Sequence, residues 1–107
     1  MNKDLIDFLL SEMRLRPGMY LGVYSLSHLN VFLTGVHISC YHLDGGGDFS
    51  DSFFGENGFL HWSWKKYGID KPAYRLDHYL DNANGNEVNA LESFFNDLAE
   101  YKSERRR

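Results

Sequence analysis

A stripe of apolar residues between positions 26 and 43 constrains the fold more than any other feature of this chain. Its members recur at intervals of three or four residues, the spacing of one face of an α-helix: Leu26, Leu29, Leu33, Val36, Cys40 and Leu43. Apolar residues also lie on the other sides of the same helix: Val31, Phe32, Ile38 and Tyr41. Because a helix that is apolar on all sides belongs in a protein interior, we expect this one at the centre of the fold.

Gly35 stands in the middle of this predicted helix. Glycine in a helix interior costs about 1 kcal/mol relative to alanine, because its backbone loses more conformational freedom. Close approach of another helix would be a reason for glycine at this position. Ser25 or Ser27 is the expected N-cap, and the helix should end near Asp44, before three consecutive glycines.

Two amphipathic helices are predicted at the ends of the chain. The first runs from Asn2, its expected N-cap, to about Leu15, and it ends before Pro17 because proline cannot donate a backbone hydrogen bond. The last runs from about Glu87 to Lys102, with the residues after it frayed, and buries one apolar stripe: Val88, Leu91, Phe94, Phe95, Leu98 and Tyr101. The solvent side of this helix is expected to hold Glu92, Asn96, Asp97 and Glu100.

The segments between these helices are less regular. Pro17 and Gly18 are typical of a type II turn, which requires a positive φ at the glycine. Residues 44–58 contain five glycines, so we expect an acidic loop that folds back on the core through its phenylalanines.

Residues 59–67 match a strand by alternation and a helix by the spacing of positions 60, 64 and 67. We favour a helix closed by Gly68, since no partner strand is apparent. A short helix from Pro72 and a turn over residues 81–86 complete the chain.

These elements predict an all-α fold, with a single domain over residues 1–107 and about five helices around the central one. The length suits one domain, and the 43% of apolar residues is enough for a core. One cysteine excludes an intrachain disulfide. No uncharged apolar run reaches the ~18–20 residues of a membrane span. The N-terminus carries acids instead of a cleavable leader, so we expect a cytoplasmic protein with no membrane contact.

The chain is acidic, and its charges are unevenly distributed. The 15 Asp and Glu against 11 Lys and Arg give a net charge of −4. No Lys or Arg occurs from Pro17 to Trp64 or from Leu76 to Tyr101. Such a surface repels phosphate backbones and attracts basic proteins. We therefore expect no direct contact with nucleic acid.

Residue types used in catalysis and metal binding are present, but not in a diagnostic arrangement. Cys40 lies on the apolar stripe and is expected to be a core residue rather than a nucleophile. His37 and His42 are five residues apart, a poor spacing for sharing a metal ion on one helix. We therefore expect no catalytic residue, cofactor or metal ion. The alternative is a small enzyme or ligand-binding regulator that uses the side of the helix with His37, Tyr41 and His42.

Several motifs, in their order along the chain, resemble those of a family of small bacterial proteins. They are a first helix of the FLSEMR type, followed by RPGMYLG (residues 16–22), SLSHLNVFLTG (25–35), FLHWSWKKYG (59–68) and ALESFFNDLAEY (90–101). Some members of that family accompany toxins as immunity proteins in contact-dependent growth inhibition and related polymorphic toxin systems. The resemblance implies a binding protein rather than an enzyme.

The charge distribution and this resemblance together predict an immunity protein that blocks a basic, nuclease-like toxin domain in the cytoplasm. Nuclease toxins carry basic clefts for phosphate, which a compact acidic protein can fill. The candidate contacts are Asp44, Asp48, Phe49, Asp51 and Glu56 in the glycine-rich loop and Asp77, Tyr79 and Asp81 in a second patch. The sequence leaves open which toxin is bound and whether the protein is oligomeric.

Overall fold

The structure, a computed structural model, describes residues 4–44, 48–69 and 76–105, with side chains except at residues 40–44 and 48–50. Its elements are α1 (Leu5–Phe8), the π-helical turn η1 (Leu9–Met13), α2 (Pro17–Leu21), α3 (Leu26–Asp44), α4 (Asp48–Phe54), α5 (Phe59–Tyr67), α6 (Asp77–Asn82) and α7 (Glu87–Arg105). These described residues contain no strand and form one bundle, which confirms the predicted all-α fold.

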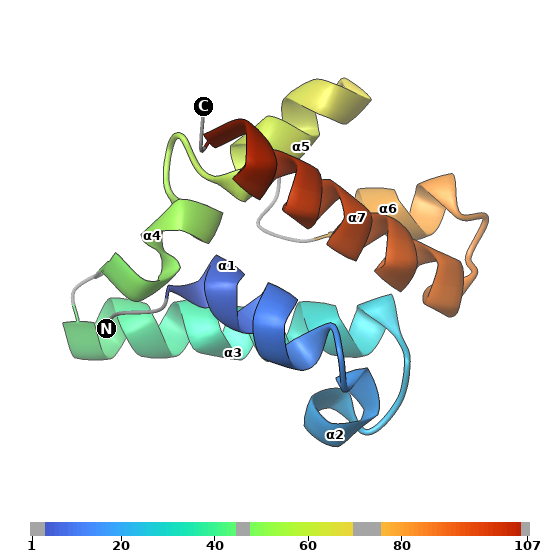
Figure 1. The fold of residues 1–107 in the computed structure, drawn as a ribbon, viewed down its shortest axis with the longest axis horizontal. Coiled ribbons are helices and arrows are strands. Elements are labelled where there is room, and N and C mark those ends of the chain that lie inside the picture. Colours follow the sequence, from blue (N-terminus) through green and yellow to red (C-terminus); the bar gives the residue numbers. More distant parts are fainter. Residues whose placement is uncertain (1–3, 45–47, 70–75, 106–107) are drawn as a thin grey trace.

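The helices are arranged around α7 (Figure 1). This helix contacts α5 and α6 on one side, and η1 and α3 on the other. α4 closes one end of the bundle by contacting α1, α3 and α5, and α2 lies against η1 and α3. The C-terminal helix therefore joins α5 and α6 to η1 and α3, and α3 also contacts α2, α4, α6 and α7.

Three phenylalanine rings form the centre of the core. Phe53 from α4, Phe59 from α5 and Phe94 from α7 are fully buried, with ring centroids 5.4–6.1 Å apart. Tilted and edge-to-face rings at such distances contribute about 0.5–1.5 kcal/mol per pair beyond the burial of their area. The burial of Phe53 and of its neighbour Phe54 confirms that this segment folds back on the core.

α3 buries one face and exposes another. Leu26, Leu29 and Leu33 are at most 2% exposed, as the apolar stripe predicts. Val31 is 72% and Ile38 53% exposed, however, so the expectation of a helix buried on all sides is wrong. α3 lies along one edge of the bundle (Figure 1). Cys40 belongs to the predicted stripe, but its side chain lies outside the described residues.

A hydrogen-bond network holds the N-terminus of α3 against α7. Ser25 is the N-cap, since its Oγ accepts a hydrogen bond from the backbone N–H of His28 at 3.2 Å. The Glu87 carboxylate accepts hydrogen bonds from the Ser27 backbone N–H (2.9 Å), the Ser27 Oγ (2.7 Å) and the Ser25 Oγ (3.1 Å). These bonds, first of all that from the Ser27 backbone, lower the pKa of Glu87. The carboxylate also complements the positive end of the α3 dipole.

The first helix begins with a cap at Asp4, whose Oδ1 accepts a hydrogen bond from the backbone N–H of Asp7 at 2.9 Å. Asn2, the predicted cap, lies outside the described residues. The α-helical bonds give way to a π turn, in which the Arg14 N–H bonds to the Leu9 carbonyl at 2.8 Å. The regular structure ends at Met13, and Leu15 is 70% exposed.

The predicted type II turn at Pro17 and Gly18 is wrong. Pro17 is instead the first residue of α2, a position that suits proline because its missing N–H would have no helical partner. Gly18 has a helical conformation, and the positive φ of this motif falls at Gly22 (φ 80°), which ends α2. RPGMYLG is thus one short helix closed by glycine.

The predicted irregular loop over residues 44–58 contains a helix, α4. The glycines that favoured a loop flank this helix and do not interrupt it. Asp48 and Asp51 consequently lie three residues apart on one helix, an arrangement that the expected loop would not give. The side chains of Asp44, Asp48 and Phe49 lie outside the described residues.

The C-terminal half follows the prediction more closely. α5 is a helix, as predicted in preference to a strand, and it is ended by Gly68 in the left-handed conformation (φ 66°). α6 begins at Asp77, and the predicted start at Pro72 lies outside the described residues. α7 extends past Lys102 to Arg105, and Val88, expected in its apolar stripe, is 44% exposed.

The corrected position of the positive φ gives a test of the RPGMYLG helix. Gly22→Ala should lower the free energy of unfolding by about 1 kcal/mol, because alanine resists the left-handed conformation. Gly18→Ala should be neutral or stabilising, since its Cβ would meet the Tyr24 ring at an ordinary 3.6 Å in a helical position. Urea denaturation of both variants measures the difference. A larger loss of stability for Gly18→Ala than for Gly22→Ala would support the type II turn instead of the short helix.

Candidate functional site

Two of the predicted acidic contacts lie exposed where the chain passes from α4 to α5. Asp51 is on α4 and Glu56 on the turn that follows it, and neither forms an ion pair with a described residue. Asp81 is exposed on α6, one turn after Asp77. The described acidic candidates therefore form two separate surfaces, one at the start of α5 and one on α6.

Asp77 also has a structural role. Its Oδ1 accepts a hydrogen bond of 2.9 Å from the side-chain amide of Asn30 on α3. The Oδ1 of the same Asn30, which is 5% exposed, accepts a hydrogen bond of 2.9 Å from the backbone N–H of Leu76. These bonds satisfy a buried amide and seat the start of α6 on α3. A substitution of Asp77 would therefore disturb the fold as well as the surface charge.

Tyr79 cannot be the exposed aromatic anchor that the sequence predicted. It is 1% exposed, and its hydroxyl donates a hydrogen bond of 2.9 Å to the Asp97 carboxylate. Its ring packs edge-on against Phe94, with the centroids 5.8 Å apart. The prediction of Tyr79 as a contact residue is therefore wrong, because its side chain belongs to the core.

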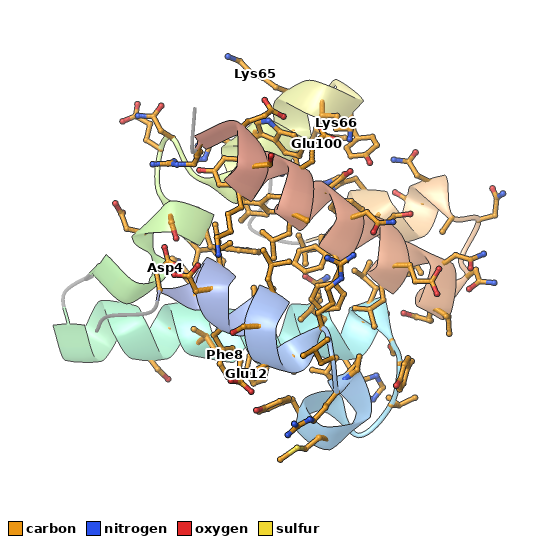
Figure 2. The ribbon with its side chains drawn as sticks, in the orientation of Figure 1. Asp4, Phe8, Glu12, Lys65, Lys66 and Glu100 are labelled. Atoms are coloured by element: carbon orange, nitrogen blue, oxygen red, sulfur yellow. The ribbon has the colours of Figure 1, made fainter. Side chains whose placement is uncertain are left out.

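Asp97, predicted on the solvent side of α7, is instead a buried carboxylate that joins three helices. It is 6% exposed and accepts hydrogen bonds from Lys66 Nζ at 2.8 Å, Tyr67 OH at 2.6 Å and Tyr79 OH at 2.9 Å. Two of these donors belong to α5 and one to α6. Lys66 also reaches the exposed Glu100, at 3.4 Å, whereas Lys65 points away from the bundle (Figure 2).

The environment of Asp97 shifts the titration of its neighbours. Burial and the hydrogen bond to Asp97 raise the pKa of Tyr67 to about 12. Burial also raises the pKa of Tyr79, and the hydrogen bond to Asp97 raises the pKa of Lys66. His78, beside Tyr79, has its pKa lowered by burial. These shifts favour the neutral phenols and the charged ammonium, the forms in which Tyr67, Tyr79 and Lys66 donate hydrogen bonds to Asp97.

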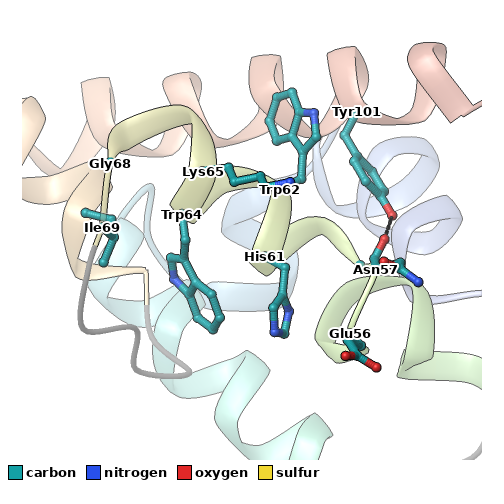
Figure 3. A pocket seen from close by; sticks show the side chains of 10 residues that line it. Glu56, Asn57, His61, Trp62, Trp64, Lys65, Gly68, Ile69 and Tyr101 are labelled. Carbon is teal, nitrogen blue, oxygen red and sulfur yellow. Dashed lines mark hydrogen bonds between the residues drawn. The ribbon is translucent and has the colours of Figure 1, made fainter.

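An open groove of about 590 Å³ runs along α5 (Figure 3). Glu56 and Asn57 lie at the end where α5 begins, and Gly68 and Ile69 at the end where it stops. Its remaining lining is mainly aromatic: Gly58, His61, Trp62, Trp64, Lys65 and Tyr101. The Tyr101 hydroxyl donates a hydrogen bond of 2.8 Å to the Asn57 carbonyl and so fixes the turn that carries Glu56. This groove was not predicted, although the aromatic run at residues 59–67 indicated where it would lie.

His61 contributes one unsatisfied polar atom to this groove. Its Nδ1 is buried and has no hydrogen-bond partner among the described residues, and its ring centroid lies 4.7 Å from that of Trp64. A buried polar atom without a partner costs about 1–3 kcal/mol. A partner side chain that entered the groove and reached this nitrogen would remove that cost.

The alternative site on α3 is only partly described. The ring of His37 packs against Phe54, with centroids 4.3 Å apart, in a half-buried position. The side chains of Tyr41 and His42 lie outside the described residues. In the part of the chain that the structure describes, no three His, Cys, Asp or Glu side chains are grouped to hold a metal ion.

Comparisons with protein-family models, with curated proteins and with solved structures find no match to this chain. Among the described helices, none is both long and apolar enough to cross a membrane. The candidate site is therefore defined by its own geometry: Glu56 at the rim of an aromatic groove, with the exposed Asp51 on the preceding helix.

The Asp97 cluster can be tested by removing its charge. Asp97→Asn should lower the free energy of unfolding by about 2 kcal/mol, because it weakens three hydrogen bonds and leaves Lys66 without its buried partner. Glu100→Gln removes the exposed, 3.4 Å partner of the same lysine and should change stability by less than about 0.5 kcal/mol. Urea denaturation measures both variants. Equal effects would mean that Asp97 is no more than a surface charge.

His78 predicts a pH dependence of stability. Its pKa in the folded protein lies below the ordinary 6.5, so the unfolded chain takes up a proton first as the pH falls. The free energy of unfolding should be at its full value above about pH 7 and decrease as the pH falls through 6.5. The decrease should be smaller in His78→Gln, measured by urea denaturation between about pH 7.5 and 5. Parallel curves for the two proteins would exclude His78 as the cause.

Proposed function

We propose that this protein is an immunity protein that binds and neutralises a toxin domain with a basic, nuclease-like binding cleft in the cytoplasm. The observation that carries the proposal is the position of Glu56 at the rim of the aromatic groove on α5. An arginine or lysine of the toxin would place its charged end on Glu56 and its aliphatic stem along the His61 and Trp64 side of the groove (Figure 3). The Trp62 and Tyr101 rings already carry Lys66 and Arg105 of this chain, at 5.2 and 5.4 Å from the ring centroids.

The groove suits a basic side chain for two physical reasons. Aromatic faces attract cations, and arginine stacks on them better than lysine does. A carboxylate next to such faces adds a charge-assisted hydrogen bond, which is about twice as strong as a neutral one. Residues that dominate protein interfaces are of this kind, namely buried aromatic and arginine side chains surrounded by a polar rim.

The acids at the start of α5 support the same kind of partner. Asp51 lies on α4, five residues before Glu56, and residues 17–64 contain no lysine or arginine, although Lys65 lines the groove and Arg105 bonds to the Asn57 carbonyl. Complementary charges increase the rate at which two proteins associate and prevent binding of partners with the same charge. The net charge of −4 disfavours nucleic acid itself as the ligand. The rival explanation is that these acids serve only solubility.

Co-expression tests the proposal directly. Open reading frames that adjoin the gene in its native genome are expressed in a bacterial host with and without this protein. We expect one of them to arrest growth and this protein to relieve the arrest. If no neighbouring product is toxic, or if none is relieved, the proposed function is wrong.

The binding surface is tested with single charge reversals. Glu56→Lys should slow association with the neutralised toxin domain at least tenfold at low salt, because it places a positive charge at the groove. Glu92→Lys makes the same change of charge on the exposed face of α7 and should have a small effect. Reversing Asp44, Asp48, Asp51 and Glu56 together should abolish protection. High salt should reduce the difference between the parent and Glu56→Lys by screening.

Surface plasmon resonance at two salt concentrations gives the association rates, and circular dichroism confirms that each variant is folded. Equal rates for Glu56→Lys and Glu92→Lys would remove the α5 groove from the interface. The α6 surface would then be examined with Asp81→Lys, since Asp77 is also needed to seat α6.

A further inference from the structure

The exposed side of α3 forms a continuous uncharged face. Residues 17–43 contain no Asp, Glu, Lys or Arg, although the chain as a whole is 24% charged. The exposed positions of α3 within this range recur at helical spacing: Ser27, His28, Val31, Thr34, Gly35, Ile38 and Ser39. We call these seven residues the outer α3 face. Solvent-exposed helix faces usually carry charged side chains, so the composition of this one requires a reason.

Gly35 lies at the middle of the outer α3 face. A Cβ atom placed there would meet no described atom within 4 Å, so no contact with the part of the chain that the structure describes requires glycine. Its φ does not require glycine either, because it lies in a regular helix. Glycine nevertheless lowers helix stability relative to alanine. Close approach by the backbone of a second molecule is a physical reason for glycine at such a position.

A groove of about 500 Å³ adjoins the N-terminal half of this face. It lies between α2 and α3 and is lined by Tyr20, Leu21, Ser27, His28, Val31 and Phe32. The lining contains no Asp, Glu, Lys or Arg. Met19 on α2 is 70% exposed and extends the apolar surface beyond α3. The groove is therefore wide and apolar enough to accept a branched aliphatic side chain.

We propose that two copies of this chain associate through the outer α3 face, with their α3 helices antiparallel about a two-fold axis between Thr34 and Gly35. In this arrangement Val31 of each copy lies opposite Ile38 of the other, because the two positions are equidistant from the axis. Thr34 lies opposite Gly35, whose missing side chain lets the helices approach. Ile38 of one copy then reaches the α2–α3 groove of the other. An interface of this kind is self-complementary, as two-fold symmetry requires.

Charge favours a second copy of the chain at this face. Two molecules of net charge −4 repel each other, and the repulsion is least around Val31, Thr34 and Ile38, since the carboxylate of Glu87 bonds to this face at Ser27, near its N-terminal end. Interface cores are likewise depleted of charged residues. A membrane surface is a poorer occupant, because helices that bind membranes flank their apolar face with lysine and arginine. The outer α3 face contains neither.

The available area agrees with a dimer of moderate stability. A helix of 19 residues is about 28 Å long, and its face alone falls short of the ~800 Å² per partner typical of stable interfaces. The exposed side of α2, with Met19 and the groove residues, supplies additional apolar surface. Val31 and Ile38 are the most exposed large apolar residues of α3 and should contribute most.

Sedimentation velocity over a range of protein concentrations tests the proposal. The parent should change from monomer to dimer with increasing concentration, and Ile38→Glu and Val31→Glu should each weaken dimerisation at least tenfold. Val88→Glu is the matched control, since it introduces the same charge at an exposed apolar residue of α7 and should leave dimerisation unchanged. All three positions are exposed, and circular dichroism verifies that the variants remain helical.

The register is tested by cross-linking. Val31 and Ile38 of the two copies lie opposite each other, so oxidation of an equimolar mixture of Val31→Cys and Ile38→Cys should give a covalent dimer, whereas the parent, with Cys40 alone, should not. A parent that remains monomeric at every concentration would overturn the proposal. So would a dimer that Ile38→Glu and Val31→Glu leave intact. Failure of the toxin experiments would not affect this result, because the dimer rests on different residues.

Discussion

The buried carboxylate of Asp97 is the interaction on which the C-terminal half of the structure depends. Burial of an ionised group is costly unless hydrogen bonds and an opposite charge compensate for it. Lys66, Tyr67 and Tyr79 supply that compensation from α5 and α6. All three donors must therefore be in place at once, so the positions of α5 and α6 on α7 are fixed together. The groove on α5 owes its shape to this constraint.

Glu87 has the same role at the other end of α7, where it binds Ser25 and Ser27 at the start of α3. A single helix thus uses two carboxylates, ten residues apart, to hold three other helices. Glu87 and Asp97 are thus committed to internal contacts, whereas Glu92 and Glu100 of the same helix remain exposed. The acids available to a partner lie both on α7 and on the shorter elements that carry Asp51, Glu56 and Asp81.

Sequence patterns predicted the helices because apolar periodicity depends on neighbouring residues alone. The stripes of α3 and α7 and the glycine that ends α5 were found in this way. Asp97 was missed because residue type was given more weight than position: it follows Phe94 by three residues and precedes Leu98 by one, on the buried side of α7. Its donors come from residues 66, 67 and 79, and no local pattern reports such contacts. The glycines around α4 led to the wrong prediction of a loop. They lie on either side of the helix, where glycine is common, and not within it.

The exposed residues Val31 and Ile38 show a limit of a different kind. Periodicity identifies an apolar helix face but cannot tell whether the same chain covers it, and here the chain does not. An uncovered apolar face on an acidic protein separates its surface into two kinds of region. The uncharged one allows identical molecules to meet, and the acidic ones repel identical molecules and attract basic ones. Binding of a second copy and binding of a basic toxin would therefore use different residues, so that both could bind at the same time.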